Sequence, residues 1–274
     1  MAKTESDQPR RRRLKGLSFN KMIPNILTLL AVAAGLTSMR FALHERWELA
    51  VFAIVIAAIL DALDGRVARL LKGASKFGAE LDSLSDFVCF GVAPAMILYL
   101  WAMQNAGRPG WILVMLFAMC MGLRLARFNV ALDDEDAPAW KAHFFTGVPA
   151  PAGAGLVLLP MVLSFQWAPE FFRDPWVVSF FLFVVGGLTV SAVPTFSFKR
   201  LKVTNRWILP TMLIVAGLAA FAVSVPWMTL SAILILYILT FPFSIQAHRR
   251  FQRRGSEKNG EKPQTQTPGT DKTA

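Results

Sequence analysis

The chain has 274 residues, of which 54% are hydrophobic and only 17% charged, and its mean hydropathy is +0.45. Soluble domains have about 45–50% apolar and about 25% charged residues, so the composition excludes an ordinary soluble domain. A net charge of +11 beside long apolar runs indicates an anionic membrane face and phosphate-bearing substrates rather than nucleic acid. The two cysteines, Cys89 and Cys120, both lie in apolar runs, which argues against a disulfide framework and a cysteine-based metal site.

Residues 1–20 form a basic arm that includes Arg10 to Arg13. The apolar run that follows passes through Ala31-Val32-Ala33, a sequence that resembles a signal-peptide cleavage site. Because the run continues to Phe41 and further runs follow, we expect an uncleaved first helix.

Eight apolar runs have the length of membrane-spanning helices, which need about 17–25 residues. They cover residues 24–41, 47–71, 81–102, 111–130, 149–167, 176–194, 207–225 and 227–247. Tryptophans lie at or near the ends of these runs, where interfacial aromatic belts are found: Trp47, Trp101, Trp111, Trp167, Trp176, Trp207 and Trp227. The sequence therefore predicts an all-α integral membrane protein, a bundle of about eight transmembrane helices.

The basic residues predict the orientation of this bundle. All but four of the 29 Lys and Arg residues fall in segments that an even number of crossings places on one side; the exceptions are Arg40, Arg46, Arg108 and Arg173. The positive-inside rule then puts both termini in the cytoplasm, and six crossings would satisfy it as well as eight. We therefore expect a membrane-embedded catalytic domain over residues 21–248 between the cytoplasmic arm and a basic, disordered cytoplasmic tail, residues 249–274.

Four aspartates lie near the cytoplasmic ends of the second and third runs. Asp61 and Asp64 are three residues apart, and Asp82 and Asp86 are four apart, so each pair shares one helix face. A charged residue costs about 2.5–3.5 kcal/mol at the bilayer centre, less near the interface, and like charges repel further. Oxygen ligands on rigid helices suit Mg²⁺ or Mn²⁺, and two such ions could share the four carboxylates.

Ion pairing with nearby cations is the alternative for these acids. It explains a single aspartate readily but not four at this spacing, and the candidate partners are Arg66, Arg69, Lys72 and Lys76.

Small residues between the acids favour ligand binding. Gly65, Ala68 and Gly78 allow a bulky ligand to approach the backbone. Arg66 and Arg69 follow the first acid pair by about one turn and could meet a pyrophosphate.

The pattern D-x2-D-G-x2-A-R-x8-G-x3-D-x3-D, from Asp61 to Asp86, is the signature of the CDP-alcohol phosphotransferases, and the chain matches it at every fixed position. Further segments resemble the bacterial and archaeal phosphatidylserine synthases within that family. They are Ile23-Pro24-Asn25-Ile26-Leu27-Thr28, Phe77 to Leu84, Phe90-Gly91-Val92-Ala93-Pro94, the run from Arg124 to Asn129, and Phe145 to Pro151. The resemblance covers residues 19 to 247.

The resemblance implies an activity and roles for the signature residues. The expected reaction moves a phosphatidyl group from CDP-diacylglycerol to the hydroxyl of L-serine and releases CMP, at the cytoplasmic face of a bacterial-type inner membrane. Asp61, Asp64, Asp82 and Asp86 would hold two divalent ions, and Asp86 would be the general base. The binding site for the CDP moiety would be lined by Gly65, Ala68, Arg69 and Gly78. The family also implies a homodimer.

Two further pairs of residues are candidates for substrate contacts. Arg124 and Arg127, on the same side as the acids, could bind the serine carboxylate, or they could be an ordinary positive-inside flank. Asn25 and Thr28 could meet the nucleotide, or they could cap a helix.

Three other functions remain open. The same family includes enzymes for other acceptors, such as glycerol 3-phosphate, inositol phosphate or choline. Intramembrane carboxylates also mark cation transporters, but those lie near the middle of the membrane in broken helices rather than at helix ends beside arginines. A non-catalytic scaffold would leave the acid spacing unexplained.

Overall fold

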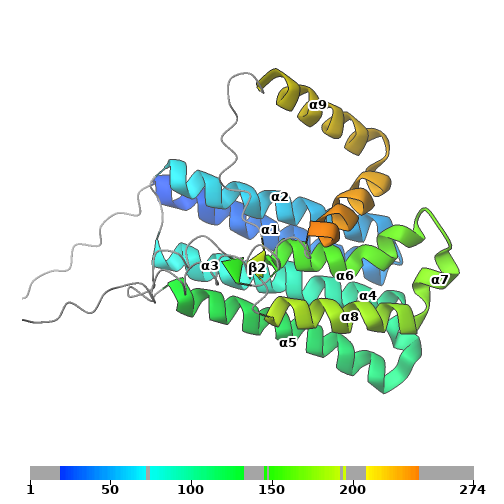
Figure 1. The fold of residues 1–274 in the computed structure, drawn as a ribbon. Helices are drawn as coiled ribbons and strands as arrows, with labels where there is room; N and C mark the ends of the chain where they lie inside the picture. The colour runs from blue at the N-terminus through cyan, green and yellow to red at the C-terminus, as the bar shows by residue number, and fades with distance from the viewer. Residues whose placement is uncertain are drawn as a thin grey trace, which may run out of the picture.

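The computed structural model describes residues 19–71, 75–132, 145–146, 148–191, 194–195 and 208–240. These residues form a bundle of helices (Figure 1). The elements are α1 (Phe19–Leu43), α2 (Trp47–Leu70), α3 (Lys76–Asp86), η1 (Phe87–Val92), α4 (Ala93–Trp101), η2 (Met103–Ala106), α5 (Gly107–Leu132), β1 (Phe145–Thr146), α6 (Ala150–Ser164), α7 (Pro169–Arg173), α8 (Pro175–Val190), β2 (Pro194–Thr195), α9 (Ile208–Ser224) and a last helix, Pro226–Thr240.

Each of the eight predicted apolar runs contains a helix, so the helical class and the membrane assignment agree with the sequence. The stretches Met22–Leu43, Lys76–Trp101 and Met103–Val130 are long and apolar enough to cross a membrane. The apolar helices Ala150–Ser164, Pro175–Val190 and Pro226–Thr240 are shorter. Eight crossings stay a prediction.

The third predicted run is a continuous rod made of α3, η1 and α4. Within it, the Ala93 N–H bonds to the carbonyl of Val88, five residues back, which is the spacing of a π-helix. The next residue, Pro94, lacks an N–H, and its ring crowds the carbonyl of Phe90 in a regular α-helix. The wider π turn accommodates this ring. Because η1 begins directly after Asp86, the change in winding lies beside the last of the four acids.

Close packing joins the rod to α1. Gly35 lies against Cys89, and a Cβ at Gly35 would come 2.8 Å from the Cys89 sulfur and 3.2 Å from its Cα. The Cys89 thiol donates a hydrogen bond of 3.2 Å to the carbonyl of Ala31. Cys89 is thus a buried structural thiol, whereas Cys120 is only half-buried; both are free.

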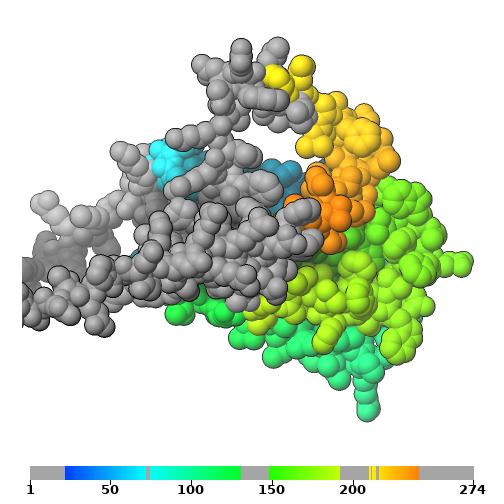
Figure 2. Space-filling model, in the orientation of Figure 1, coloured from blue at the N-terminus to red at the C-terminus, as the bar shows by residue number. Residues whose placement is uncertain are grey.

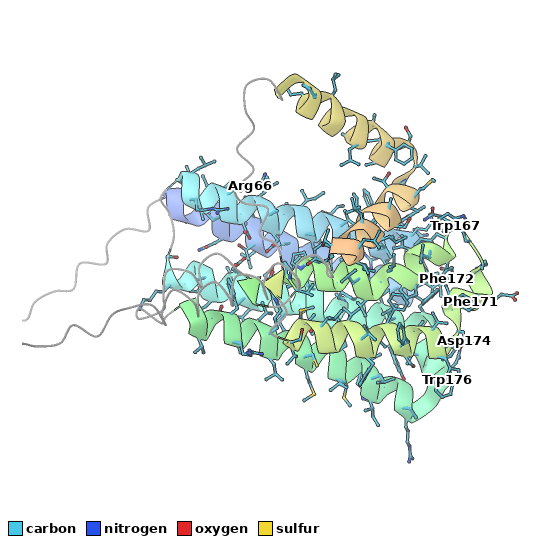
Figure 3. All side chains as sticks on the ribbon, viewed as in Figure 1. Arg66, Trp167, Phe171, Phe172, Asp174 and Trp176 are labelled. Carbon is cyan, nitrogen blue, oxygen red and sulfur yellow. The ribbon has the colours of Figure 1, made fainter. Side chains whose placement is uncertain are left out.

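The two ends of the bundle differ in chemistry (Figure 3). Arg66 is at one end, near the end of α2, and an aromatic cluster around α7 is at the other. Trp167 and Trp176 are exposed there, as interfacial tryptophans should be. Trp101 differs from the prediction, because it is buried in the core. Its backbone carbonyl accepts a hydrogen bond of 3.0 Å from Nε of Arg173, which holds α7 against the end of α4.

The last helix, Pro226–Thr240, packs on the bundle, whereas α9 stands apart from it (Figures 1 and 2). Trp227 stacks edge-on against Phe165 with a centroid distance of 4.9 Å, and Gln166 donates a hydrogen bond of 3.3 Å to Ser231. The strands β1 and β2 pair antiparallel, with Phe145 opposite Thr195, and so tie the segment before α6 to the segment after α8.

Some predictions fall on parts of the chain outside the described residues. These are the tail over 249–274, the basic arm except for its last two residues, which begin α1, and the single residues Lys72 and Trp207.

Candidate active site

Two of the four acids, Asp64 and Asp82, line a hollow where α1, the end of α2 and the start of α3 meet. Its volume is about 170 Å³. The lining residues are Pro24, Asn25, Thr28, Asp64, Gly65, Ala68, Ser75, Gly78, Ala79 and Asp82. The structure therefore brings together in one cavity most of the residues that the sequence assigned to the metal and nucleotide sites.

Three carboxylates converge at this hollow. Asp61, Asp64 and Asp82 each offer one oxygen, and these oxygens lie within 4.8 Å of one another. Asp86 lies behind them: its carboxyl group is within hydrogen-bonding reach of Asp61, and its Oδ1 is buried without a hydrogen-bond partner among the described residues. An unpartnered buried carboxylate oxygen beside three others fits a divalent cation, because hard cations take oxygen ligands.

Thr28 orients one of the acids. Its Oγ1 lies 2.7 Å from Oδ2 of Asp64 and 3.0 Å from the carbonyl of Pro24, so its single proton is shared between two acceptors. Asp64 is 4% exposed and Thr28 equally so. Thr28 therefore fixes Asp64 from α1, and because Thr28 also lines the hollow, its contact with the nucleotide stays a prediction.

The first turn of α3 faces the hollow. Ser75 is its N-cap, and its Oγ accepts a hydrogen bond of 3.0 Å from the N–H of Gly78. A Cβ at Gly78 would lie 3.1 Å from both the Ser75 Oγ and the Asn25 Oδ1, so a glycine lets α3 begin close to α1. Backbone N–H groups at a helix start favour anionic groups.

Gly65 and the two arginines that follow it differ in how they lie relative to the hollow. A Cβ at Gly65 would meet nothing within 4 Å, so this side of the hollow is open. Nε of Arg69 donates to the carbonyl of Gly65 at 2.9 Å. Arg66 does not line the hollow; it borders a separate apolar groove.

Arg124 of α5 lies on the inner side of the acid cluster. It interacts electrostatically with Asp86, Asp61 and Tyr237, and Tyr237 belongs to the last helix, Pro226–Thr240. Its Nε and Nη1 are buried and have no hydrogen-bond partner in the part of the chain that the structure describes. A buried guanidinium with unused donors can bind an anionic group such as a carboxylate.

The second arginine, Arg127, is engaged elsewhere. Its Nη1 donates a hydrogen bond of 2.7 Å to the carbonyl of Val190, at the end of α8. The two arginines share only a small hollow of about 20 Å³ beside Thr189 and Ser191, room for a single water.

Some residues at the site were not predicted from the sequence. Ser75 carries a recognisable signal, because a serine before a helical run is a common N-cap. Tyr237 carries none, because its approach to Arg124 depends on how the last helix packs on the bundle.

The chain belongs to the class of helical membrane proteins that have clustered carboxylates at one end of the bundle. Comparison with known proteins narrows this class to one family. Residues 21–192 match the family model of the CDP-alcohol phosphatidyltransferases, and residues 206–242 match that of CDP-alcohol phosphatidyltransferase 2. Since the first match alone covers more than half of the chain, the chain belongs to the CDP-alcohol phosphatidyltransferase family.

Several relatives carry the same name, CDP-diacylglycerol–serine O-phosphatidyltransferase. The protein of Mycobacterium tuberculosis is 39% identical over 242 residues, 88% of this chain and 83% of the relative. That of Helicobacter pylori is 35% identical over 220 residues, 80% of this chain and 88% of the relative. That of Bacillus subtilis is 35% identical over 147 residues, 54% of this chain and 77% of the relative.

The carboxylate cluster predicts direct binding of Mn²⁺ to the purified protein. Asp82→Asn should weaken it about tenfold or more, since even residues that only support metal ligands cost that much when lost. Titration of Mn²⁺ followed by electron paramagnetic resonance measures the free ion. The matched control is Glu80→Gln, the same change of charge on an exposed residue of the same helix. Equal weakening in both variants would mean that general charge, not ligation, attracts the ion.

Proposed function

We propose that the protein transfers the phosphatidyl group of CDP-diacylglycerol to the hydroxyl of L-serine, giving phosphatidylserine and CMP. The observation that carries this proposal is the convergence of the four aspartates beside a hollow capped by a helix start, in a chain of this family whose relatives bear the name of that reaction. An acceptor other than serine remains the second candidate, because the acid cluster would serve any member of the family.

The hollow suits the CDP end of the lipid. Gly65 leaves space against the backbone, Ala68 and Gly78 line the hollow without bulky side chains, and the start of α3 offers N–H groups to phosphate oxygens. Asn25, on the opposite wall, offers an amide to the nucleotide. Asp61, Asp64, Asp82 and Asp86 would hold the divalent ions, Mg²⁺ or Mn²⁺, which when bound neutralise the phosphate charge and that of the departing CMP.

Asp86 is the residue that we assign to proton removal. In the reaction, the serine oxygen forms a bond to the phosphorus of the phosphatidyl group, the bond from that phosphorus to the CMP oxygen breaks, and the serine hydroxyl loses its proton. Asp86 lies next to Asp61, with its buried Oδ1 free of other partners among the described residues and Arg124 nearby. Asp86 can thus accept the hydroxyl proton of a serine whose carboxylate is bound by that arginine, if the hydroxyl lies within hydrogen-bonding reach.

Arg124 supplies the site for the serine carboxylate. Its two unused buried donors point to an anionic ligand, and its position beside Asp86 would place the hydroxyl of a bound serine near the base. Arg127, which is bonded to the end of α8, we assign to holding the rim of this site.

The active site faces the cytoplasm in this proposal, with both termini on the same side. Support comes from the basic residues that flank the acidic end and from the aromatic cluster at the far end of the bundle (Figure 3). Sealed inverted vesicles should therefore use added serine, and sealed vesicles of native orientation should not.

Serine should be the preferred acceptor. Purified protein with CDP-diacylglycerol, Mn²⁺ or Mg²⁺ and a panel of labelled alcohols should release CMP and form phosphatidylserine, and chelation should stop the reaction. Equal or better use of glycerol 3-phosphate would replace serine in this assignment and leave the family membership untouched.

Loss of Arg124 should affect serine selectively. Arg124→Gln should raise KM for serine about 10–100-fold, the worth of a charged hydrogen bond, and raise KM for the lipid much less. Ethanolamine lacks the carboxylate, so the wild type should use it less efficiently than serine. In Arg124→Gln the kcat/KM values for the two acceptors should become similar. The control is Arg127→Gln, for which we expect only a small change. A selective effect of Arg124→Gln on the lipid would instead assign this arginine to the phosphates.

Asp86 should separate chemistry from binding. Asp86→Asn should lower kcat about 10²–10⁴-fold with little change in lipid affinity, because proton transfer is lost. Asp82→Asn, the same change at a proposed metal ligand, should lower the affinities for metal and lipid together. Full recovery of Asp86→Asn by excess Mn²⁺ would show that Asp86 acts only as a metal ligand and not also as the base.

A further inference from the structure

The last helix, Pro226–Thr240, carries a tyrosine to the acid end of the bundle. Its first turn stacks on Phe165, just after the end of α6, and further along a Cβ at Gly155 would come 2.7 Å from Cδ2 of Leu234. Gly155 belongs to the first half of α6, so the two helices run antiparallel. Because α6 ends toward α7 and the aromatic cluster, its start lies at the acid end (Figures 1 and 3). Tyr237 follows Leu234 by three residues on the same face and lies about one turn closer to that end.

Arg124 reaches the same region from another face of α6. On α5, Met121 lies against α6, where a Cβ at Gly153 would come 2.9 Å from the Met121 Cε. Arg124 follows Met121 by three residues, about one turn nearer the acids. The segment from Ala150 to Gly155 contains only alanine, proline and glycine, and small residues let neighbouring helices approach closely. The start of α6 therefore brings α5 and the last helix near enough for their side chains to meet.

Arg124 links Tyr237 to the acid cluster. The guanidinium interacts electrostatically with Tyr237 and also with Asp86 and Asp61. Its Nε and Nη1 are buried without a hydrogen-bond partner in the stretches of chain that the structure describes. A neutral tyrosine hydroxyl can donate one hydrogen bond and carries no charge that would compete for the arginine. An anionic group that enters between Arg124 and Tyr237 thus meets donors from two helices.

We propose that Tyr237 is a specificity-determining residue of the acceptor site: its hydroxyl donates a hydrogen bond to the carboxylate that Arg124 binds. The inference rests on the proposed function, in which L-serine is the acceptor, and adds a second contact for its carboxylate. One guanidinium and one neutral hydroxyl match the single charge of a carboxylate, whereas a phosphate monoester carries a charge of about −1.5 to −2 and calls for more cations.

The proposal gives the C-terminal part of the chain a share in the choice of acceptor. Tyr237 lies outside the first family match, residues 21–192, which contains the four acids and Arg124, and inside the second, residues 206–242. The acids and the hollow serve the transfer itself, and the last helix adds a contact that only an acceptor with a carboxylate can use.

Tyr237→Phe removes the hydroxyl and keeps the ring. At saturating CDP-diacylglycerol and Mn²⁺, KM for L-serine should rise about 10–100-fold, the worth of a hydrogen bond to a charged group. KM for the lipid should stay near that of the wild type, because the lost contact is to the acceptor alone. Ethanolamine has the ammonium and the hydroxyl of serine but no carboxylate, so its Ki as a competitor of labelled serine should not change.

The matched control is Tyr99→Phe, the same change at the other of the two tyrosines in the chain. Tyr99 is half-buried like Tyr237, and its ring stacks edge-on against Trp111 with a centroid distance of 5.0 Å. This variant should keep the wild-type KM for serine.

The outcomes separate the tyrosine from the proposed function. If the wild type does not transfer the phosphatidyl group to serine, the proposed function fails. If it does and Tyr237→Phe keeps the wild-type KM for serine, the role of Tyr237 is wrong. Equal increases of the KM for serine and the Ki for ethanolamine would also overturn it, because they would show that Tyr237 only supports the packing of the site.

A double variant tests whether Tyr237 and Arg124 bind the same group, and it needs no second acceptor. In Arg124→Gln the carboxylate has lost its charged partner, so the addition of Tyr237→Phe should raise KM for serine much less than it does in the wild type. A full increase of about 10–100-fold on top of Arg124→Gln would show that the hydroxyl acts apart from this arginine and would contradict the shared site.

Discussion

Crowding of four carboxylates into one end of an apolar bundle is the constraint on which the rest of the structure depends. The oxygens of Asp61, Asp64 and Asp82 lie within 4.8 Å of one another, and Asp86 reaches Asp61 from behind. Such a group is costly in a low-dielectric environment unless positive charge is supplied from outside the protein. The protein's own nearest buried cation, Arg124, can neutralise only part of it. The cluster thus combines high cost with a demand for cations, which is typical of a functional site.

The packing around the cluster keeps the carboxylates in place. Thr28 fixes Asp64 from α1, and the close start of α3 at Gly78 sets where Asp82 falls. Beyond Asp86, the π turn of η1 places the rod against α1, where Gly35 admits Cys89. Each of these contacts joins a small or polar residue to a neighbouring helix, so the acid positions depend on helix packing and not on flexible loops.

Local spacing made much of the site predictable. Pairs three and four residues apart share a helix face, and this rule placed the two acids of each pair together, with Gly65, Ala68 and Gly78 between the pairs. Helical positions followed equally well from the apolar runs. Contacts between distant segments were not predictable in this way: the burial of Trp101, the π turn before Pro94 and the approach of Tyr237 depend on tertiary packing. For the same reason Arg66, Arg124 and Arg127, equally basic in sequence, have three different surroundings in the structure.

The two faces of α2 show how one helix can serve a substrate that is polar at one end and apolar at the other. The face with Asp61 and Asp64 meets α1 and α3, where polar groups converge, while the face with Ala58 and Ala62 meets α6 and the last helix, where the lining is apolar. Because both faces belong to one rigid element, their relative position is fixed. Polar contacts on the first face and apolar contacts on the second therefore keep a constant separation, which a flexible loop would not provide.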